Sequence, residues 1–171
     1  MRLILMRHAS AVERPNARGE RPLSEKGEHE ADAAGFFLRM VGEVPDVIMH
    51  SSMLRSRVTA ERVMAKVGQD GVLTKRGDLD EDSSAEEFLM SVAGEFGASN
   101  KKIMAVGHNP FMTDIALRVM TGSRSSPAID RIDKASVFAV DCVSSALWIQ
   151  RFYMPRALLL KVYDAWLAYS G

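Results

Sequence analysis

The sequence opens with MRLILMRHAS, residues 1–10. Its apolar run, Leu3 to Met6, is long enough for one buried strand and ends abruptly at a cation and an imidazole, Arg7 and His8. Small residues follow, so the backbone can turn there without bulk. In an open α/β sheet, ligands bind outside the carboxyl ends of the strands. We therefore expect Arg7 and His8 at a ligand-binding edge, although an isolated Arg-His pair can also simply begin a polar loop.

The bulk composition predicts one cytoplasmic domain. A chain of 171 residues can bury a core as a single domain, residues 1–171, without disulfides or metal. Lys plus Arg and Asp plus Glu both number 22, so no net basic field attracts nucleic acid or an anionic membrane, although a local basic patch remains possible. The single cysteine, Cys142, suits a reducing compartment. We see no signal peptide or membrane span, and we expect a monomer.

Alternating strands and helices predict an α/β fold. Two further apolar runs, 47–49 and 103–106, end in polar residues as the first one does. Strand-helix-strand units in succession favour a parallel sheet with right-handed crossovers. We expect helices at 24–42, 53–67, 86–96, 111–120 and from Pro155 onward, a short edge strand at 72–73, and a hairpin of strands 135–140 and 146–152. The predicted fold is a three-layer α/β/α sandwich whose mostly parallel central sheet has an antiparallel edge hairpin. Its last helix carries an apolar stripe of Leu158, Leu159, Val162, Trp166 and Leu167.

Four charged or polar side chains should meet at one edge of this sheet. Arg7 and His8 follow the first strand, Arg55 comes shortly after the second, and His108 follows the third. Arginine offers a planar fork of donors that matches phosphate oxygens, and helix N-termini such as the one expected near Met53 also favour phosphate. The sequence therefore predicts a site for a doubly negative, tetrahedral anion.

The same group of residues can do covalent chemistry. An imidazole beside two cations resists protonation, because like charge disfavours the charged form. One ring nitrogen then stays available as a nucleophile, and covalent catalysis divides a hard displacement into two easier ones. The second imidazole would donate hydrogen bonds to oxygens on which charge develops.

Four motifs in chain order resemble those of a known family. Residues 5–9, Leu-Met-Arg-His-Ala, look like its Arg-His-Gly motif, and residues 107–110, Gly-His-Asn-Pro, look like a later one. Residues 21–24, Arg-Pro-Leu-Ser, with Gly27, match a segment that reads Arg-x-Leu-Thr with a later glycine. Residues 51–61 resemble a motif in which arginine precedes a Thr-Ala pair, and Arg55, rather than Arg57, keeps that spacing. The family is the histidine phosphatase superfamily, also called phosphoglycerate-mutase-like.

The resemblance implies a fold, a reaction and a set of roles. The fold would be phosphoglycerate-mutase-like, and the short chain without an inserted cap domain resembles the branch of SixA, a phosphohistidine phosphatase. The implied enzyme is a hydrolase that removes phosphate from phosphohistidine on a carrier or phosphorelay protein, without cofactor. A covalent phosphohistidine would form on His8, with Arg7, Arg55 and His108 completing the catalytic pocket. Substrate-binding roles are expected for Arg21, Ser52 and Asn109.

The sequence departs from the family pattern at three positions. Ala9 replaces the usual glycine, which matters only if that position needs a positive φ. Ser52 stands where proline is common, and Val58 stands where glutamine is common. None of these changes removes a group from the expected chemistry.

The sequence offers three candidates for a general acid, and none of them is required. Many family members use a carboxylate in the middle of the chain to protonate an alkoxide leaving group. Here Asp80, Glu81 and Asp82 are the candidates, but they could equally form a solvated acidic loop. Imidazole, with an unperturbed pKa of about 6.5, leaves far more easily than an alkoxide. A site without such an acid would therefore favour a phosphohistidine substrate.

Several alternatives stay open. The substrate could instead be a small phosphorylated metabolite, which would require a positioned acid and a deep polar pocket, or the chain could be a non-catalytic phosphate-binding regulatory module. His50 could contact the substrate or be a half-buried core residue. Three histidines near one edge also suggest zinc, but the adjacent arginines would repel a cation, so we expect no metal.

Overall fold

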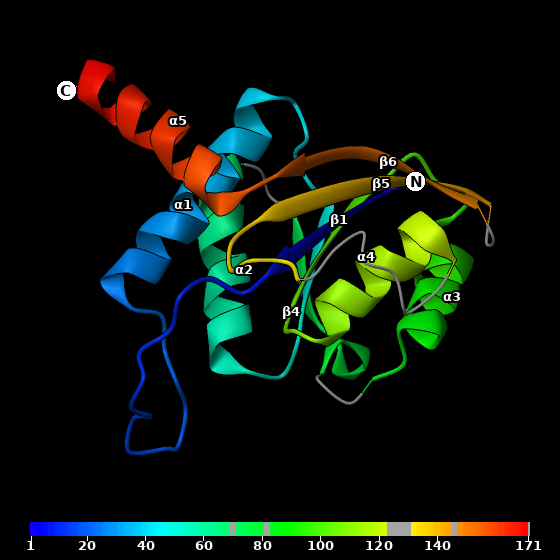
Figure 1. The fold of residues 1–171 in the computed structure, drawn as a ribbon, viewed down its shortest axis with the longest axis horizontal. Helices are drawn as coiled ribbons and strands as arrows, with labels where there is room; N and C mark the ends of the chain where they lie inside the picture. Colours follow the sequence, from blue (N-terminus) through cyan, green and yellow to red (C-terminus); the bar gives the residue numbers. More distant parts are fainter. Residues whose placement is uncertain (69–70, 81–82, 123–130, 145–146, 171) are drawn as a thin grey trace.

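The computed structural model describes residues 1–68, 71–80, 83–122, 131–144 and 147–170, and its centre is a six-stranded mixed sheet (Figure 1). The order of the strands across the sheet is β3-β2-β4-β1-β5-β6. Their bounds are β1 (Arg2–Arg7), β2 (Val47–His50), β3 (Val72–Lys75), β4 (Lys102–Gly107), β5 (Val137–Ser144) and β6 (Leu147–Met154). The apolar runs of β1, β2 and β4 lie next to one another in the middle, where both faces of a sheet are covered.

The parallel register brings the carboxyl ends of three strands to one edge. β4 pairs in parallel with both β1 and β2, with Arg7 opposite Gly107 and His50 opposite Val106. The backbone N–H of His8 then donates to the carbonyl of Gly107 at 2.9 Å. Residues that follow these strands therefore emerge side by side, as the polar strand ends in the sequence predicted.

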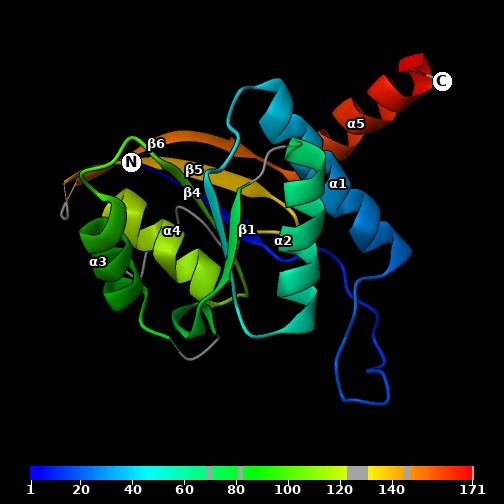
Figure 2. The ribbon, with the colours of Figure 1, turned by 180° about the vertical axis from the view of Figure 1, so that it is seen from behind.

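Helices cover both faces of the sheet (Figures 1 and 2). On one face lie α1 (Glu25–Met40), α2 (Leu54–Val67) and α5 (Arg156–Ser170), and on the other lie α3 (Ala85–Phe96) and α4 (Phe111–Thr121). Each face has its own core: Ile4 and Met6 pack toward α1 and α2, whereas Leu3 and Leu5 pack toward α3 and α4. The predicted α/β/α sandwich with an antiparallel edge hairpin is confirmed.

The start of the hairpin differs from the prediction. β5 begins at Val137 rather than at residue 135, because Ala135 has a φ of 58° and Ser136 closes a turn onto the carbonyl of Asp133. The Ala135 N–H instead donates to the carbonyl of Arg7 at 2.9 Å, and Lys134 forms a short parallel bridge with Arg7. Lys134 and Ala135 therefore lie beside the carboxyl end of β1. Residue 146, expected in the second strand, lies outside the described residues.

The apolar stripe of α5 is only partly buried. Leu159 is 1% exposed and packs in the core, whereas Leu158, Trp166 and Leu167 are each more than 40% exposed. Both views show the helix leaving the body of the molecule toward the C-terminus (Figures 1 and 2). Within the described residues, none of the helices has the length and apolarity needed to cross a membrane.

Close packing explains why the Arg-Pro-Leu-Ser segment, residues 21–24, is followed by a glycine at position 27. Ser24 caps α1 by accepting a hydrogen bond from the Gly27 N–H at 3.1 Å, and the Ser24 N–H donates to the Ser10 carbonyl. A Cβ built on Gly27 would lie 1.8 Å from that carbonyl oxygen. The first turn of α1 thus packs directly on the loop that follows His8.

We expect Gly27→Ala to lower the free energy of unfolding by about 1–3 kcal/mol, because the added methyl displaces the Ser10 backbone. Gly94→Ala is the matched control: Gly94 is also within a helix, but a Cβ there meets nothing within 4 Å. The control should be stabilising by up to ~1 kcal/mol. Urea unfolding of both variants measures the difference, and equal stabilities would contradict this close packing.

Candidate active site

His8 lies directly after β1 and is held in one tautomer. Its Nδ1 is 2.7 Å from the carbonyl oxygen of Ala9, and the Nε of Arg55 is 3.2 Å from its Nε2. Because a carbonyl oxygen only accepts, Nδ1 must carry the hydrogen, and Nε2 must present its lone pair to the Arg55 N–H. His8 as a whole residue is 6% exposed. His8 is thus a buried imidazole whose basic nitrogen, Nε2, faces the guanidinium of Arg55.

The surroundings keep the His8 ring neutral. Burial, followed by the neighbouring His108, Arg55 and Arg7, lowers the pKa of His8 to about 3, although the Ala9 carbonyl opposes this shift. A group with a pKa this low carries no proton on Nε2 at neutral pH. His8 is therefore a neutral imidazole in this site, and its role as the nucleophile stays a prediction.

His108 faces His8 from the end of β4. The two ring centroids are 4.9 Å apart with an interplanar angle of 51°. The Nε2 of His108 is 2.5 Å from the hydroxyl oxygen of Ser51, a fully buried residue that follows β2. Burial and the charge of Arg55 lower the pKa of His108 to about 4. We did not select Ser51 from the sequence, although its place at the start of the second motif was a signal.

Thr59 fixes Arg55 relative to His8. Its hydroxyl donates to the Arg55 carbonyl one turn earlier in α2, at 2.7 Å, and accepts from the backbone N–H of Ala9 at 3.1 Å. The four-residue offset between Arg55 and Thr59 is thus one helical turn that also reaches the loop after His8. Arg57, in contrast, points outward: its side chain is 52% exposed and pairs with Glu61 at 3.4 Å. The register chosen from the sequence agrees with this geometry.

Arg7 and Asn109 share a backbone acceptor beside the two histidines. Nη1 of Arg7 and Nδ2 of Asn109 both donate to the carbonyl of Ile132, at 3.4 and 2.9 Å. Both residues line a hollow of about 440 Å³. The Nε of Arg7 and the Oδ1 of Asn109 are buried without a hydrogen-bond partner among the described residues. Burial and the charge of Arg131 lower the pKa of Arg7. The Arg7 guanidinium therefore has donor capacity left for an anion.

Ser52 and Asp80 contact each other. The backbone N–H and the hydroxyl of Ser52 both donate to the same carboxylate oxygen of Asp80, each at 2.8 Å. Asp80 is near enough to His108 to oppose the lowering of its pKa. The expected substrate-binding Ser52 is thus directed at one of the candidate acids. The other two candidates, Glu81 and Asp82, lie outside the described residues.

Three further residues from the sequence analysis, Arg21, His50 and Ala9, have local backbone roles around the site. Arg21 donates from Nε to the carbonyl of Val12 at 2.8 Å, on the loop before α1. His50 is buried, and its Nδ1 lies 2.8 Å from the Ser51 carbonyl, so it supports the chain beside the site. Ala9 has no positive φ, since Ala135 is the one non-glycine residue of this kind in the described chain. The alanine at the family's glycine position therefore introduces no backbone strain.

A buried carboxylate supports the loop after His8. Glu30 in α1 accepts from the backbone N–H and the hydroxyl of Ser10, at 2.9 and 3.1 Å, and from Arg156 at 3.2 Å. Its side chain is fully buried. We did not identify Glu30 from the sequence, because a glutamate in an amphipathic helix usually faces solvent.

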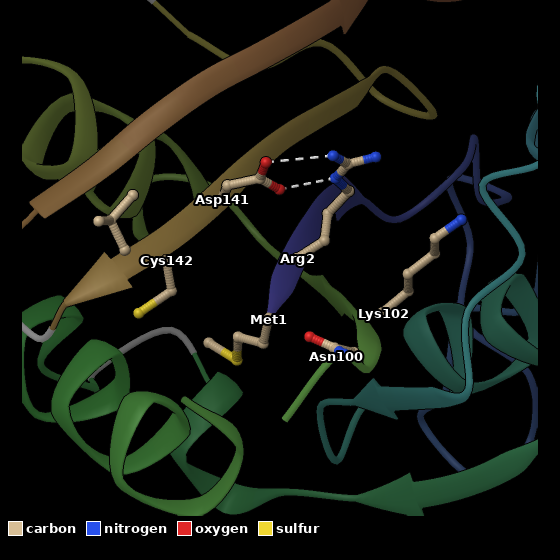
Figure 3. Close-up of a pocket in the computed structure, with 7 residues that line it drawn as sticks. Met1, Arg2, Asn100, Lys102, Asp141 and Cys142 are labelled. Atoms are coloured by element: carbon tan, nitrogen blue, oxygen red, sulfur yellow. Dashed lines mark hydrogen bonds and ion pairs between the residues drawn. The ribbon is translucent and has the colours of Figure 1, made fainter. Parts of the chain in front are cut away.

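A hollow at the opposite edge of the sheet shows a different arrangement of charge (Figure 3). There Arg2 and Asp141 face each other through two hydrogen bonds of 2.7 and 3.1 Å, and Arg2 also pairs with Glu43. Lys102 pairs with Glu43 as well, at 3.2 Å. These cations are neutralised within the chain, so the edge with His8 is the better anion site. In the described part of the chain, no three His, Cys, Asp or Glu side chains are grouped to hold a metal ion.

Comparison with known proteins agrees with this geometry. Residues 3–85 match the family model described as histidine phosphatase superfamily (branch 1). The structure of the protein histidine phosphatase SixA complexed with tungstate is similar, with a TM-score of 0.79 and 18% identity, covering 93% of this chain and 99% of that one. A phosphohistidine phosphatase SixA from Agrobacterium tumefaciens gives 0.71 and 22%, covering 90% and 97%. An α-ribazole-5'-P phosphatase from Escherichia coli gives 0.71 and 17%, covering 91% and 97%.

Among curated proteins, none matches the sequence significantly. At these identities the structural matches establish the fold, and they cover phosphatases with different substrates. The family model supplies the sequence relationship, because its match contains the motifs around His8 and Arg55. The resemblance expected from the sequence is confirmed over residues 3–85, which match the histidine phosphatase superfamily, and this match together with the phosphatase-like fold supports a phosphatase.

Proposed function

We propose that this phosphatase hydrolyses phosphohistidine on a carrier or phosphorelay protein, through a covalent phosphohistidine on His8. The observation that supports this most directly is the state of the His8 ring. Its Nδ1 is engaged by the Ala9 carbonyl and its Nε2 carries a lone pair beside Arg55. A buried, neutral imidazole with a fixed basic nitrogen is what nucleophilic attack on phosphorus requires.

The first step transfers the phosphoryl group to the enzyme. The lone pair of His8 Nε2 forms a bond to phosphorus while the bond from phosphorus to the substrate ring breaks, and that ring, protonated on its other nitrogen, leaves with the electron pair as neutral imidazole. The Arg55 N–H that now meets Nε2 turns to a phosphoryl oxygen, and Arg7 and His108 contact the others. In the second step water attacks the phosphorus, the bond to Nε2 breaks, and inorganic phosphate leaves. Fixed cationic donors stabilise the charge that builds on the oxygens in both steps.

The position of Asp80 favours a substrate with an easy leaving group. One of its carboxylate oxygens accepts two hydrogen bonds from Ser52. Those bonds hold the carboxylate of Asp80 against Ser52, on the loop before α2, and occupy that oxygen. Imidazole, with an unperturbed pKa of about 6.5, leaves with little proton assistance, unlike an alkoxide. This favours phosphohistidine over a phosphate ester.

A second candidate is hydrolysis of a small phosphorylated metabolite. The similarity to the α-ribazole-5'-P phosphatase structure, at a TM-score equal to that of the Agrobacterium SixA structure, supports it. This function would require a proton donor for an alkoxide. We also predict that the chain is a single domain without a cap, that it is a monomer and that it is cytoplasmic. Each of these properties would suit access by a protein substrate.

The direct test compares turnover of a phosphohistidine-bearing carrier protein with turnover of small phosphate esters, both without added metal. We expect fast phosphate release from the carrier and little from the esters, because only the carrier offers imidazole as the leaving group. Release from the esters alone would instead support the metabolite phosphatase. Release from neither would support a binding module.

We expect Arg55→Ala to reduce kcat/KM by roughly 10²–10³-fold, the effect of removing one donor to the transition state. Arg57→Ala is the matched control in the same helix turn, since Arg57 pairs only with Glu61 in the described contacts. Its effect on stability should be about 0.5 kcal/mol or less, with activity near that of the unmodified protein. Steady-state kinetics of both variants measure the difference, and equal losses would contradict the assignment of Arg55.

A further inference from the structure

A second hollow adjoins the one that Arg7 and Asn109 line. Its volume is about 450 Å³, and it shares Arg7 and Arg131 with the hollow described above. Five of the side chains that line it are cationic: Arg7, Lys26, Arg131, Lys134 and Arg156. One carboxylate, Asp133, lines it as well. We call this hollow, defined by these residues, the basic groove.

The basic groove has a surplus of positive charge, although the chain as a whole has none. Arg131 pairs with Asp133 at 3.4 Å, and Arg156 pairs with the buried Glu30 at 3.2 Å. Lys26 and Lys134, in contrast, form no ion pair with any residue that the structure describes. The positive field of the basic groove therefore attracts negative charges on a substrate in addition to the two charges of its phosphoryl group.

The backbone holds Lys134 in place beside Arg7. Lys134 forms the parallel bridge with Arg7, and the next residue, Ala135, donates from its N–H to the Arg7 carbonyl. Ala135 adopts a φ of 58° with its side chain fully buried. A left-handed conformation at a non-glycine residue costs of order 1–3 kcal/mol, persists only where the surroundings enforce it, and is enriched at functional sites. Burial and the charges of Arg7 and Arg21 also lower the pKa of Lys134.

We propose that the basic groove is a docking subsite for carboxylate side chains that flank the phosphohistidine on the substrate protein. This proposal rests on the proposed function and adds a recognition element to it. Its position next to Arg7 means that a protein surface presenting phosphohistidine to His8 would also cover Lys26 and Lys134. Opposite charge across such an interface accelerates association and selects partners.

The chemistry of the groove favours carboxylates on a protein over a second phosphate group of a small molecule. A built phosphate site uses convergent, fixed donors such as the guanidinium fork. Here the guanidiniums of Arg131 and Arg156 already contact carboxylates of the chain. Apart from Arg7, which we assign to the phosphoryl group, the unpaired charges are lysine ammonium groups on flexible stems. Such groups tolerate anions at varied positions, as on an acidic protein surface.

The test uses the double variant Lys26→Glu with Lys134→Glu. Two substrates are compared: a histidine-phosphorylated carrier protein with acidic residues beside its phosphohistidine, and phosphoramidate, which has the same phosphorus-nitrogen bond but no surface. We expect kcat/KM for the carrier to fall roughly 10- to 100-fold more than kcat/KM for phosphoramidate, the size of an electrostatic steering effect. With the unmodified enzyme, the carrier reaction should also slow as salt increases, because surface charges are screened.

The matched control is Lys101→Glu, which makes the same charge change just before β4 at the opposite edge of the sheet. We expect it to keep the ratio of the two activities seen in the unmodified enzyme. Phosphoramidate turnover also shows that each variant is folded. Inactivity of the unmodified enzyme on both substrates would contradict the proposed function itself.

Two results together would overturn only the docking subsite. The unmodified enzyme would hydrolyse the carrier without salt dependence, and the double variant would keep the same ratio of kcat/KM for the carrier to kcat/KM for phosphoramidate. The same holds if the double variant loses activity selectively toward a sugar bisphosphate and retains it toward the carrier. That result would assign the basic groove to the second phosphate of a small molecule.

Discussion

The hydrogen bond from His8 Nδ1 to the Ala9 carbonyl is the constraint on which the site depends. It assigns the ring hydrogen to one nitrogen, so the other nitrogen keeps its lone pair and meets Arg55. Burial beside two guanidiniums then holds the pKa of the ring at about 3, and the nucleophile stays neutral among cations that would stabilise a phosphoryl group. The short loop from His8 to Ser10 is held in position by Thr59, Glu30 and Gly27, which supports this hydrogen bond.

The parallel sheet makes that arrangement possible. Three strands that are distant in sequence end in register at one edge, so His8, Ser51 and His108 emerge within a few ångströms of one another. The N-terminal turn of α2 brings Arg55 to the same place. The antiparallel hairpin adds the segment before β5, which returns beside Arg7 and supplies Lys134 and the Ile132 carbonyl. At the opposite edge, the charges of Arg2 and Lys102 are paired with Glu43 and Asp141.

Most of the fold and the centre of the site could be predicted from the sequence, because both depend on local patterns. Short apolar runs that stop at polar residues identify buried parallel strands and their ligand-binding ends, and Leu3 to His8 is the clearest case. The supporting residues could not be predicted, because their burial depends on partners far along the chain. Glu30 reads as a surface residue until Ser10 and Arg156 surround it. Ala135 reads as strand until its N–H bonds to the Arg7 carbonyl, and α5 continues past the end of the core with part of its apolar stripe exposed.

The central claim is that His8 carries the phosphoryl group during turnover. The most direct measurement incubates the enzyme with a radioactively phosphorylated carrier protein, stops the reaction in alkali, where phosphohistidine survives, and maps the label by peptide sequencing. The account predicts label on His8, loss of the label on acid treatment, and no label in His8→Ala. Label on another residue, or full turnover by His8→Ala, would contradict it.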